Sequence, residues 1–434
     1  MDKKGLLGIS PLIVFVLFYL GSALIAGNFT SMPIVVAFMV SVIYAVCITR
    51  GLSLPDRVRV FGRGAGTTKI IFMILIFLVA GAFASSAMAM GCIGETVDFI
   101  LSVLPPQLVY ASLFIAGCFI SMATGSGIGA IVAVGPIAVG VAEGLGVSMS
   151  FMGALVVCSA MFGDNLSFIS DTTVVATTTQ GCELKDKFRT NIWLVIPASI
   201  LVVALYIWMG RDVQPVLEEH VVEPLKMLPY LVVLIASVCG VDIFISLLSG
   251  TLLCGIEGMI YGDFDFFGWA DAMGDGINNM GSLVIMIILA SGFMALIKHN
   301  GGLEYLVKVC SRFVKGRRSA EFFICLITAL MCACTAVNTV AVISISGVVK
   351  EISEKFGVAP RRAASLLDTS SCIIQEVIPY SPHLLAAAAF AKISVVTMIP
   401  YVYYAYLLAV FVVLSIIFNI PRVKMPTNVL EQAK

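Results

Sequence analysis

The sequence predicts an all-α polytopic membrane protein of about ten transmembrane helices plus two re-entrant hairpins, in two inverted-topology repeats with two unwound helices. Three observations predict this class. Of the 434 residues, 60% are hydrophobic and 12% are charged, whereas about a quarter of the residues of a soluble domain are charged. Apolar stretches of about 20 residues, the length of a membrane-crossing helix, recur along the chain. Two further apolar regions are interrupted by polar clusters at matching places.

Charge and cysteine content exclude several other classes of protein. The 26 basic and 26 acidic residues balance, so the chain lacks the basic surplus that nucleic-acid binding needs. Most of the 12 cysteines fall inside apolar runs, and no CxxC or Cys/His spacing typical of a metal centre occurs. The HExxH and GxSxG motifs are absent as well. We therefore expect no nucleic-acid partner, no cofactor other than coupling ions, and no enzymatic activity.

Hydropathy predicts the plain spans in chain order. Each is an apolar stretch long enough to cross the bilayer as a helix. They run over 6–26, 32–49, 70–92, 191–210, 226–240, 243–261, 281–299 and 396–419. The regions 107–180 and 321–392 are too long for one span and too often interrupted for simple ones.

Basic residues predict the orientation, because cytoplasmic loops collect lysine and arginine. Beyond the N-terminus, the basic clusters lie at 50–69, 185–189, 308–318 and 350–362. All of them reach the cytoplasm only if 107–145 and 321–356 are re-entrant hairpins, each entering and leaving on one side. Of the 26 basic residues, only Arg211, Lys226 and Lys392 then lie outside. Both termini are expected in the cytoplasm.

A shift of 211 residues superposes the two interrupted regions without a gap, which predicts an internal repeat. Thr124 falls on Thr335, and Ser170 falls on Ser381. Because five spans precede residue 211, the second copy enters the membrane in the opposite orientation, the plan of many secondary transporters. The expected units are a first repeat over 1–211 (spans 1–5, hairpin 107–145, broken helix 149–181), an external linker over 212–225, and a second repeat over 226–434 (spans 6–10, hairpin 321–356, broken helix 363–392).

Four polar clusters mark where helices are expected to be interrupted inside the membrane. Unpaired backbone groups are costly in hydrocarbon, so unwound segments persist only where they line a cavity or hold an ion. Carbonyl, hydroxyl, amide and carboxylate oxygens suit a hard cation such as Na+. The predicted cation- or substrate-binding residues are Thr124 and Ser126 at the first hairpin tip, Asp164, Asn165, Ser167, Ser170, Asp171 and Thr172 in the first break, Thr335, Asn338 and Thr339 at the second tip, and Gln375, Glu376 and Ser381 in the second break.

Carboxylates inside predicted spans are functional candidates, since a charge within the membrane is costly. The candidates for proton coupling are Asp164, Asp171, Glu376 and Asp368. Each has a structural alternative: helix capping for the first two, a hydrogen-bonding role for the third, and an ion pair with Arg361 or Arg362 for the fourth. Two interpretations of His383 remain open: it belongs to a proton path, or it is a solvated or helix-capping histidine.

Two motifs carry a resemblance to a known family. The run GDNLSFISDTT (163–173) resembles the signature of the NhaC-type Na+/H+ antiporter family. The segment GVAPRRAASLLDTSSCIIQEVIPYSPHLL (357–385) is similar to that family's GLAP…LED…IPW region. The resemblance covers nearly the whole chain in order and spacing. The sequence departs from the motifs at Asn165, where the family commonly has lysine, at Phe168, where it has proline, and at IPYSP in place of IPW.

The resemblance implies a member of the ion-transporter superfamily in the bacterial cytoplasmic (inner) membrane. Its scaffold would form a homodimer while a transport domain moves as an elevator, with Na+ and H+ as coupling ions. Asp164 and Asp171 match the family's motif carboxylates and would hold Na+. The family assigns no role to Glu376.

Two functions from the transporter class remain open. The first is a Na+/H+ antiporter in which the two ions compete for one carboxylate site. The alternative is a Na+- or H+-coupled transporter or exchanger of a small organic solute, an amino acid or a carboxylate, which the many hydroxyl and amide side chains around both breaks would suit. A channel is disfavoured because an inverted repeat with broken helices suits alternating access. The lipid bilayer, the two ions and a second copy of the chain are the expected partners, with an organic solute under the alternative.

Overall fold

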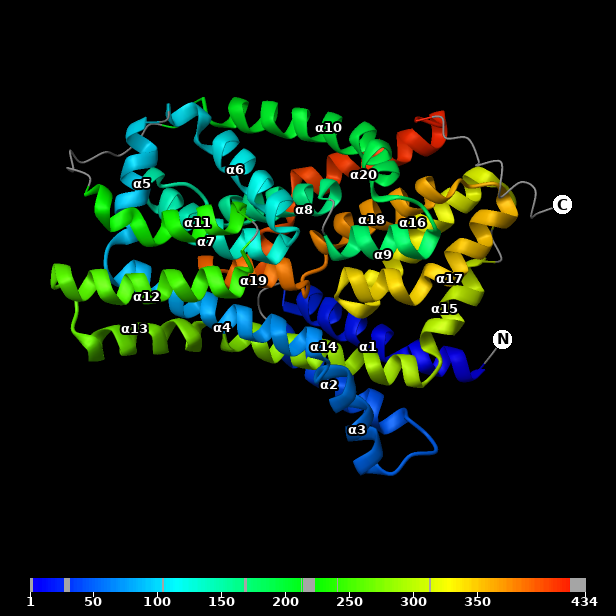
Figure 1. The fold of residues 1–434 in the computed structure, drawn as a ribbon. Coiled ribbons are helices and arrows are strands. Elements are labelled where there is room, and N and C mark those ends of the chain that lie inside the picture. Colours follow the sequence, from blue (N-terminus) through cyan, green and yellow to red (C-terminus); the bar gives the residue numbers. More distant parts are fainter. Residues whose placement is uncertain are drawn as a thin grey trace.

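The computed structural model describes residues 3–26, 32–103, 105–167, 170–211, 213, 223–239, 241–311 and 314–421, and every regular element in this part of the chain is a helix (Figure 1). Seven helical segments there are long and apolar enough to cross a membrane, or eight if one bent pair is a single span. Shorter apolar helices accompany them. The prediction of an all-α polytopic membrane protein is therefore confirmed. The expected external linker at 212–225 lies mostly outside the described residues.

The described residues up to 211 form ten α-helices and one short 3-10 helix. In order these are α1 (Lys3–Ala26), α2 (Ile34–Ile48), α3 (Leu54–Ala65), α4 (Thr68–Ala89), α5 (Cys92–Val103), η1 (Pro106–Leu108), α6 (Val109–Thr124), α7 (Gly127–Leu145), α8 (Met149–Leu166), α9 (Asp171–Gln180) and α10 (Leu184–Met209).

The described residues after 211 form a further ten α-helices and three short 3-10 helices. In order these are η2 (Pro224–Met227), α11 (Leu228–Val238), α12 (Ile243–Tyr261), α13 (Phe266–Asn279), α14 (Gly281–His299), α15 (Gly302–Ser311), α16 (Arg317–Thr335), α17 (Asn338–Phe356), α18 (Pro360–Gln375), α19 (Pro382–Ala391), η3 (Val395–Thr397), η4 (Ile399–Tyr401) and α20 (Tyr403–Phe418).

Some helices were not expected from hydropathy. The helices α3, α5 and α15 are too short to register as spans, and α3 carries Arg57, Arg59 and Arg63. Helix α14 begins directly after α13, and the two helices together form one apolar segment, Phe266–His299. Hydropathy finds long apolar stretches, and it therefore missed helices that are short, amphipathic or appended to a span.

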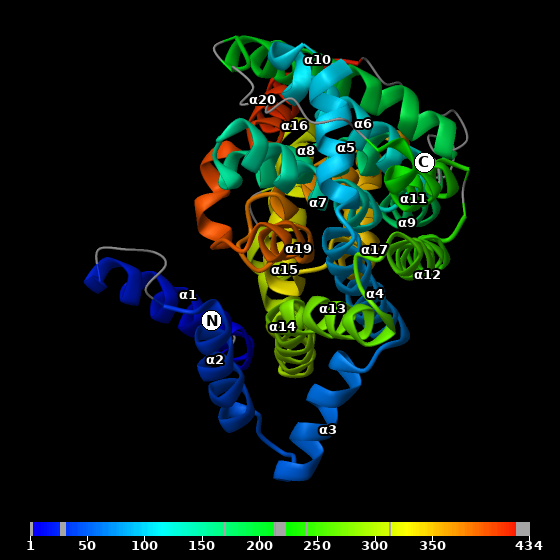
Figure 2. The same ribbon diagram turned by 90° about the vertical axis from the view of Figure 1, so that its left-hand side faces the viewer.

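The helices pack in two groups (Figures 1 and 2). In one, α4 packs against α12 and α13, α14 packs against α2 and α3, and α1 packs against α2 and α15. In the other, α6, α7 and α8 pack together, α16 packs against α17 and α18, and α19 packs against α7 and α8. In both views α1, α2, α13 and α14 lie in the lower part with α3 below them, whereas α10 and α20 lie near the top.

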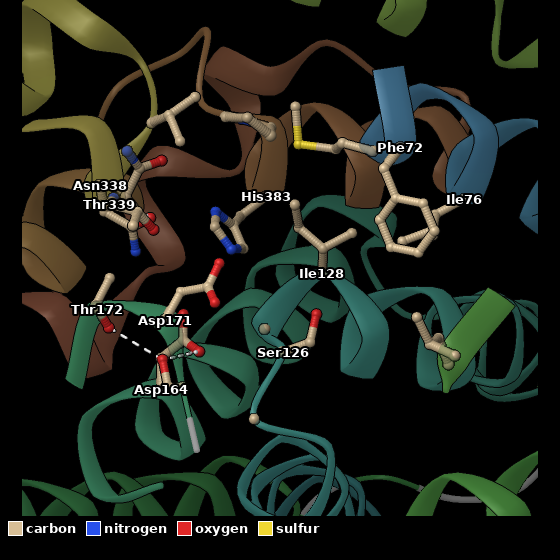
Figure 3. A pocket seen from close by; sticks show the side chains of 18 of the residues that line it. Phe72, Ile76, Ser126, Ile128, Asp164, Asp171, Thr172, Asn338, Thr339 and His383 are labelled. Atoms are coloured by element: carbon tan, nitrogen blue, oxygen red, sulfur yellow. Dashed lines mark hydrogen bonds between the residues drawn. The ribbon is translucent and has the colours of Figure 1, made fainter. Parts of the chain in front are cut away.

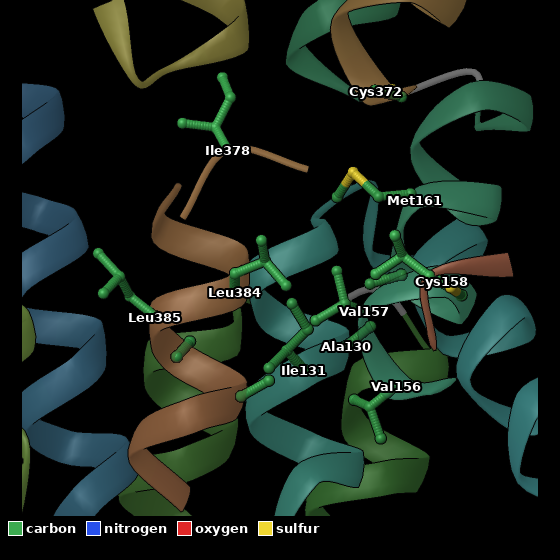
Figure 4. Packing of buried hydrophobic residues seen from close by; sticks show 14 of the residues in the cluster. Ala130, Ile131, Val156, Val157, Cys158, Met161, Cys372, Ile378, Leu384 and Leu385 are labelled. Atoms are coloured by element: carbon green, nitrogen blue, oxygen red, sulfur yellow. The ribbon is translucent and has the colours of Figure 1, made fainter. Parts of the chain in front are cut away.

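Small and branched apolar side chains fill the second group. Ala130 and Ile131 of α7, Val157 of α8 and Leu384 of α19 are buried against one another (Figure 4). Helices α6 and α8 approach so closely that a β-carbon on Gly163 would overlap Ser121. Close packing of this kind holds the interrupted helices in a fixed arrangement.

Large apolar side chains are exposed on the outer helices. Examples are Leu17 on α1, Trp208 on α10, Ile260 on α12 and Phe418 on α20. Such a surface would aggregate in water but is what a helix presents to lipid. The exposed residues therefore agree with the membrane environment that the composition predicts.

Candidate functional site

Four interruptions separate consecutive helices, at 125–126 (α6–α7), 167–170 (α8–α9), 336–337 (α16–α17) and 376–381 (α18–α19). Gly125 ends α6 with a left-handed backbone, φ 64°. Ala336 ends α16 in the same region, φ 56°, which is costly for a residue with a β-carbon. The Ser126 hydroxyl then begins α7 by accepting a hydrogen bond from the Gly129 N–H at 3.1 Å.

A cavity of about 420 Å³ brings all four interruptions together (Figure 3). Residues that the sequence predicted at both tips and both breaks line it. They are Ser126, Asp164, Ser170, Asp171, Thr172, Asn338, Thr339 and Gln375. Segments far apart in the chain thus contribute polar side chains to a single space.

Asp164 is the most buried carboxylate of the cavity, with 5% of its surface exposed. It lies in the last turn of α8, where the helix dipole places negative partial charge. Ser170 donates a hydrogen bond from Oγ to Asp164 Oδ1 at 3.2 Å and also hydrogen-bonds Thr172 at 3.0 Å. A carboxylate at a helix C-terminus is poorly compensated by the helix itself, so a cation beside it is favoured.

The first residue of α7 faces this carboxylate. A β-carbon on Gly127 would stand 3.1 Å from both Asp164 Oδ2 and His383 Nε2. Figure 3 shows Asp164, Asp171 and His383 turned toward the same space, with Ser126 beside them. The hydrogen of a glycine leaves room there that a methyl group would occupy.

Charge in the cavity is predominantly negative. Asp164, Asp171 and Asp242 contribute carboxylates and His383 an imidazole, and no lysine or arginine is among the described residues that line it. Asp171 is the first residue of α9, and Asp242 caps α12 by accepting a hydrogen bond from the Phe244 N–H at 2.9 Å. The cavity therefore attracts cations and repels anions.

Sequence reasoning missed part of the lining. Phe72, Met73 and Ile76 of α4 form an apolar side of the cavity, and Asp242 lies at the start of α12. A uniformly apolar span does not show which of its faces meets a site, so α4 offered no signal. Asp242 is exposed and caps α12, and it lines the cavity as well.

A buried ion pair lies behind the first break. Lys187 Nζ is 2.7 Å from Asp368 Oδ2, and the two side chains are 1% and 0% exposed. Lys187 Nζ also donates to the Asn165 carbonyl at 2.8 Å and to Thr173 Oγ1 at 2.6 Å. The expectation that the basic cluster at 185–189 forms a loop is wrong for Lys187, because α10 already begins at Leu184 and buries this side chain.

Asp368 is in an ion pair, as one alternative proposed, but its partner is not a neighbouring arginine. Arg362 instead donates from Nε and Nη2 to Glu321 Oε2 at 3.1 and 3.0 Å, and to Ser415 Oγ at 2.5 Å. Residues of a helix six positions apart point in different directions, so Arg362 faces α16 and α20 while Asp368 faces α10.

Two predicted ligands lie away from the cavity lining. The Asn165 amide donates to the Met161 carbonyl at 2.9 Å and to Tyr404 Oη at 3.2 Å. Glu376 is fully buried directly after α18, and its carboxyl lies beside Cys158 of α8 and the backbone of Ala405 in α20. Both side chains point toward neighbouring helices rather than toward the cavity.

The remaining predicted residues shape the interruptions. Ser167 Oγ donates to the Met122 carbonyl at 3.0 Å, and Thr335 Oγ1 donates to the Met331 carbonyl at 3.0 Å. The Ser381 hydroxyl caps α19 by accepting from the Leu384 N–H at 3.2 Å. The side chain of Thr124 lies outside the described residues. The hydroxyls of Ser167 and Ser381 satisfy backbone groups that the interruptions leave open, whereas Thr335 bonds back to the preceding turn of its own helix.

Comparison with known proteins gives a family match over most of the chain. The model of the Na+/H+ antiporter family matches residues 3–211 and 215–420. The chain is 22% identical to the Na(+)/H(+) antiporter NhaC of Alkalihalophilus pseudofirmus, over 92% of this chain and 93% of that protein. It is 27% identical to the malate-2H(+)/Na(+)-lactate antiporter of Bacillus subtilis, over 42% of this chain and 39% of that protein. MtrF of Neisseria gonorrhoeae, of a class of antimetabolite efflux pumps, is a solved structure with a TM-score of 0.43 and 12% identity, over 90% of this chain and 96% of that one.

Proposed function

The chain belongs to the Na+/H+ antiporter family, and we propose that it exchanges Na+ for H+ across the bacterial inner membrane through the cavity beside Asp164. The observation that carries the proposal is the charge of that cavity. Its described lining holds three carboxylates and no lysine or arginine, and the most buried carboxylate stands at the negative end of α8. Such a space favours a cation.

Asp164 is the proposed binding carboxylate, with Asp171 beside it. Ser170 orients one Asp164 oxygen, and the hydroxyl and amide groups of Ser126, Thr172 and Asn338 supply further polar atoms around the same space. Na+ and H+ compete for this carboxylate, so that the site crosses the membrane only when it is occupied or neutralised. A higher pH should therefore lower the apparent KM for Na+, because fewer protons compete.

An inverted repeat with two re-entrant hairpins and two unwound helices is the proposed architecture for this exchange. Its support is the spacing of the helices. The second-half helices begin 211 residues after their first-half counterparts, at 127 and 338 (α7, α17), 149 and 360 (α8, α18), and 171 and 382 (α9, α19). The interruptions between them would be the hairpin tips and the unwound segments.

The proposed movement is an elevator. Its support is the division of helices into two packing groups, since the cavity takes nearly all of its polar residues from the group containing α7, α8, α17 and α18. That group would slide past the other one, which would act as scaffold and dimer interface. The basic clusters support ten spans with both termini in the cytoplasm.

The cavity does not favour an organic anion as substrate. The malate and lactate of one relative's name are carboxylates, and a site for them needs basic groups or free amide donors. The described lining instead presents carboxylates. The alternative of organic-acid exchange therefore has weaker support than Na+/H+ exchange.

Purified protein in liposomes with a trapped pH dye tests the proposal. A Na+ gradient should drive proton movement in the wild type, and Asp164→Asn should abolish it. Asp275→Asn is the matched control, because Asp275 is exposed on α13 and does not line the cavity. The proposal is overturned if a Na+ gradient does not change the internal pH of liposomes containing the wild-type protein at any starting pH. Normal exchange by the Asp164→Asn variant would overturn it as well.

A further inference from the structure

The Lys187 ammonium occupies a position that has the chemistry of a cation site. Its three N–H donors meet three oxygens: the Asp368 carboxylate at 2.7 Å, the Asn165 carbonyl at 2.8 Å and the Thr173 hydroxyl at 2.6 Å. These oxygens come from α18, from the end of α8 and from the start of α9. Carboxylate, carbonyl and hydroxyl oxygens are also what a hard monovalent cation takes.

This position adjoins the cavity without opening into it. Asn165 follows Asp164 directly, and the Thr173 hydroxyl also donates to the Asp164 carbonyl at 3.4 Å. Asn191 reinforces the same group by donating from Nδ2 to the Asn165 carbonyl at 2.8 Å and to Asp368 Oδ2 at 3.0 Å. The end of α8 therefore has two carboxylates beside it, one facing the cavity and one facing Lys187.

We propose that Lys187 is a tethered cation, which permanently fills the second of two cation positions at the α8–α9 break and so limits the break to one transported Na+. The inference rests on the proposed function, which places the other position at Asp164. A buried carboxylate needs a compensating charge. Asp368 receives it from Lys187, so Asp164 is left as the one buried carboxylate of the break that recruits an ion from the cavity.

The number of Na+ ions bound per chain distinguishes this role from a structural one. Equilibrium binding of radioactive Na+ to purified protein should give about one ion for the wild type and for Lys187→Arg, which keeps the charge. Lys187→Met keeps the length of the side chain but removes the charge, and it should bind about two ions, because Na+ compensates Asp368. A Lys187→Met protein that folds and binds about one ion overturns the inference.

A second pair of variants keeps the test decisive if Lys187→Met does not fold. Asp368→Asn leaves the ammonium uncompensated beside Asp164, and should weaken Na+ binding by about tenfold or more. The double variant Lys187→Met/Asp368→Asn removes both charges and should restore about one ion, with an affinity within about threefold of the wild type. A double variant that binds Na+ no better than Asp368→Asn overturns the inference, since a merely structural pair would not be rescued.

The wild-type measurement separates the two proposals. Wild-type protein that neither binds nor exchanges Na+ overturns the proposed function. Wild-type protein that binds and exchanges Na+, together with a Lys187→Met variant that still binds about one ion, overturns only the role of Lys187.

Discussion

Ser170 donates a hydrogen bond from its Oγ to Asp164 Oδ1 at 3.2 Å, across the interruption between α8 and α9. The donor precedes the first residue of α9, and the acceptor lies in the last turn of α8. The bond therefore ties the direction of the carboxylate to the geometry of the break. The other carboxyl oxygen stays on the side of Gly127 and His383.

Removing this hydrogen bond should weaken Na+ binding. Ser170→Ala leaves Asp164 free to rotate, and a hydrogen bond to a charged group contributes about 1.5–3 kcal/mol. We expect the apparent KM for Na+ in liposomes to rise by roughly tenfold or more, with a smaller change in kcat. Ser344→Ala is the control, because its hydroxyl bonds only within an exposed part of α17. An unchanged KM in Ser170→Ala would contradict the role given to this bond.

A methyl group on Gly127 should reduce cation binding without unfolding the protein. The new β-carbon would lie 3.1 Å from Asp164 Oδ2 and from His383 Nε2, and 2.8 Å from the flexible end of Met161. Alanine also favours a helix over glycine by up to about 1 kcal/mol, so stability should hold. We expect exchange at low Na+ to fall by roughly tenfold for Gly127→Ala. Gly347→Ala should behave as wild type, because nothing lies within 4 Å of its β-carbon position.

The pair between Glu321 and Arg362 should stabilise the fold. Glu321→Gln would leave the buried Arg362 guanidinium without its carboxylate, and breaking such a pair costs about 3–5 kcal/mol. We expect a clear fall in the thermal midpoint of purified protein followed by intrinsic fluorescence. Glu351→Gln is the control, since Glu351 is exposed on α17 of the same helical hairpin. Equal midpoints for the two variants would show that the pair contributes nothing.

Relieving the backbone at Ala336 should stabilise the protein. The left-handed conformation there, φ 56°, costs a residue with a β-carbon about 1–2 kcal/mol relative to glycine. Ala336→Gly should therefore raise the thermal midpoint. Ala389→Gly inside α19 should lower the midpoint, because glycine costs about 0.5–1 kcal/mol of unfolding free energy there. If Ala336→Gly loses as much stability as Ala389→Gly, the conformation carries no strain.

Polar residues in apolar surroundings proved to be the best guide to the cavity. Ser126, Asp164, Asn338 and Gln375 come from four segments, and all of them line the same space. They could be predicted because unwound backbone and polar side chains inside a membrane are tolerated only where they are buried in protein or line a cavity. Their roles as ligands stay predictions, as do the hairpins, the orientation and the dimer.

Side-chain direction is what sequence reasoning could not supply. Glu376 and Asn165 carry the same kind of polar atoms as their neighbours Gln375 and Asp164, yet they point away from the cavity. The faces of a broken helix depend on where the break falls, and a shift of one residue turns a side chain by about 100°. Hydropathy and spacing do not resolve such a shift.

The sequence by itself determined the membrane class, the antiporter family and the polar segments that meet. Only the tertiary structure decided that Lys187 pairs with Asp368, that Arg362 pairs with Glu321, and that α4 forms the apolar side of the cavity. The physical reason is that the local sequence around a basic residue does not distinguish a side chain in a loop from one in a buried ion pair. Its partner is brought near by the packing of distant helices, and local sequence does not contain that packing.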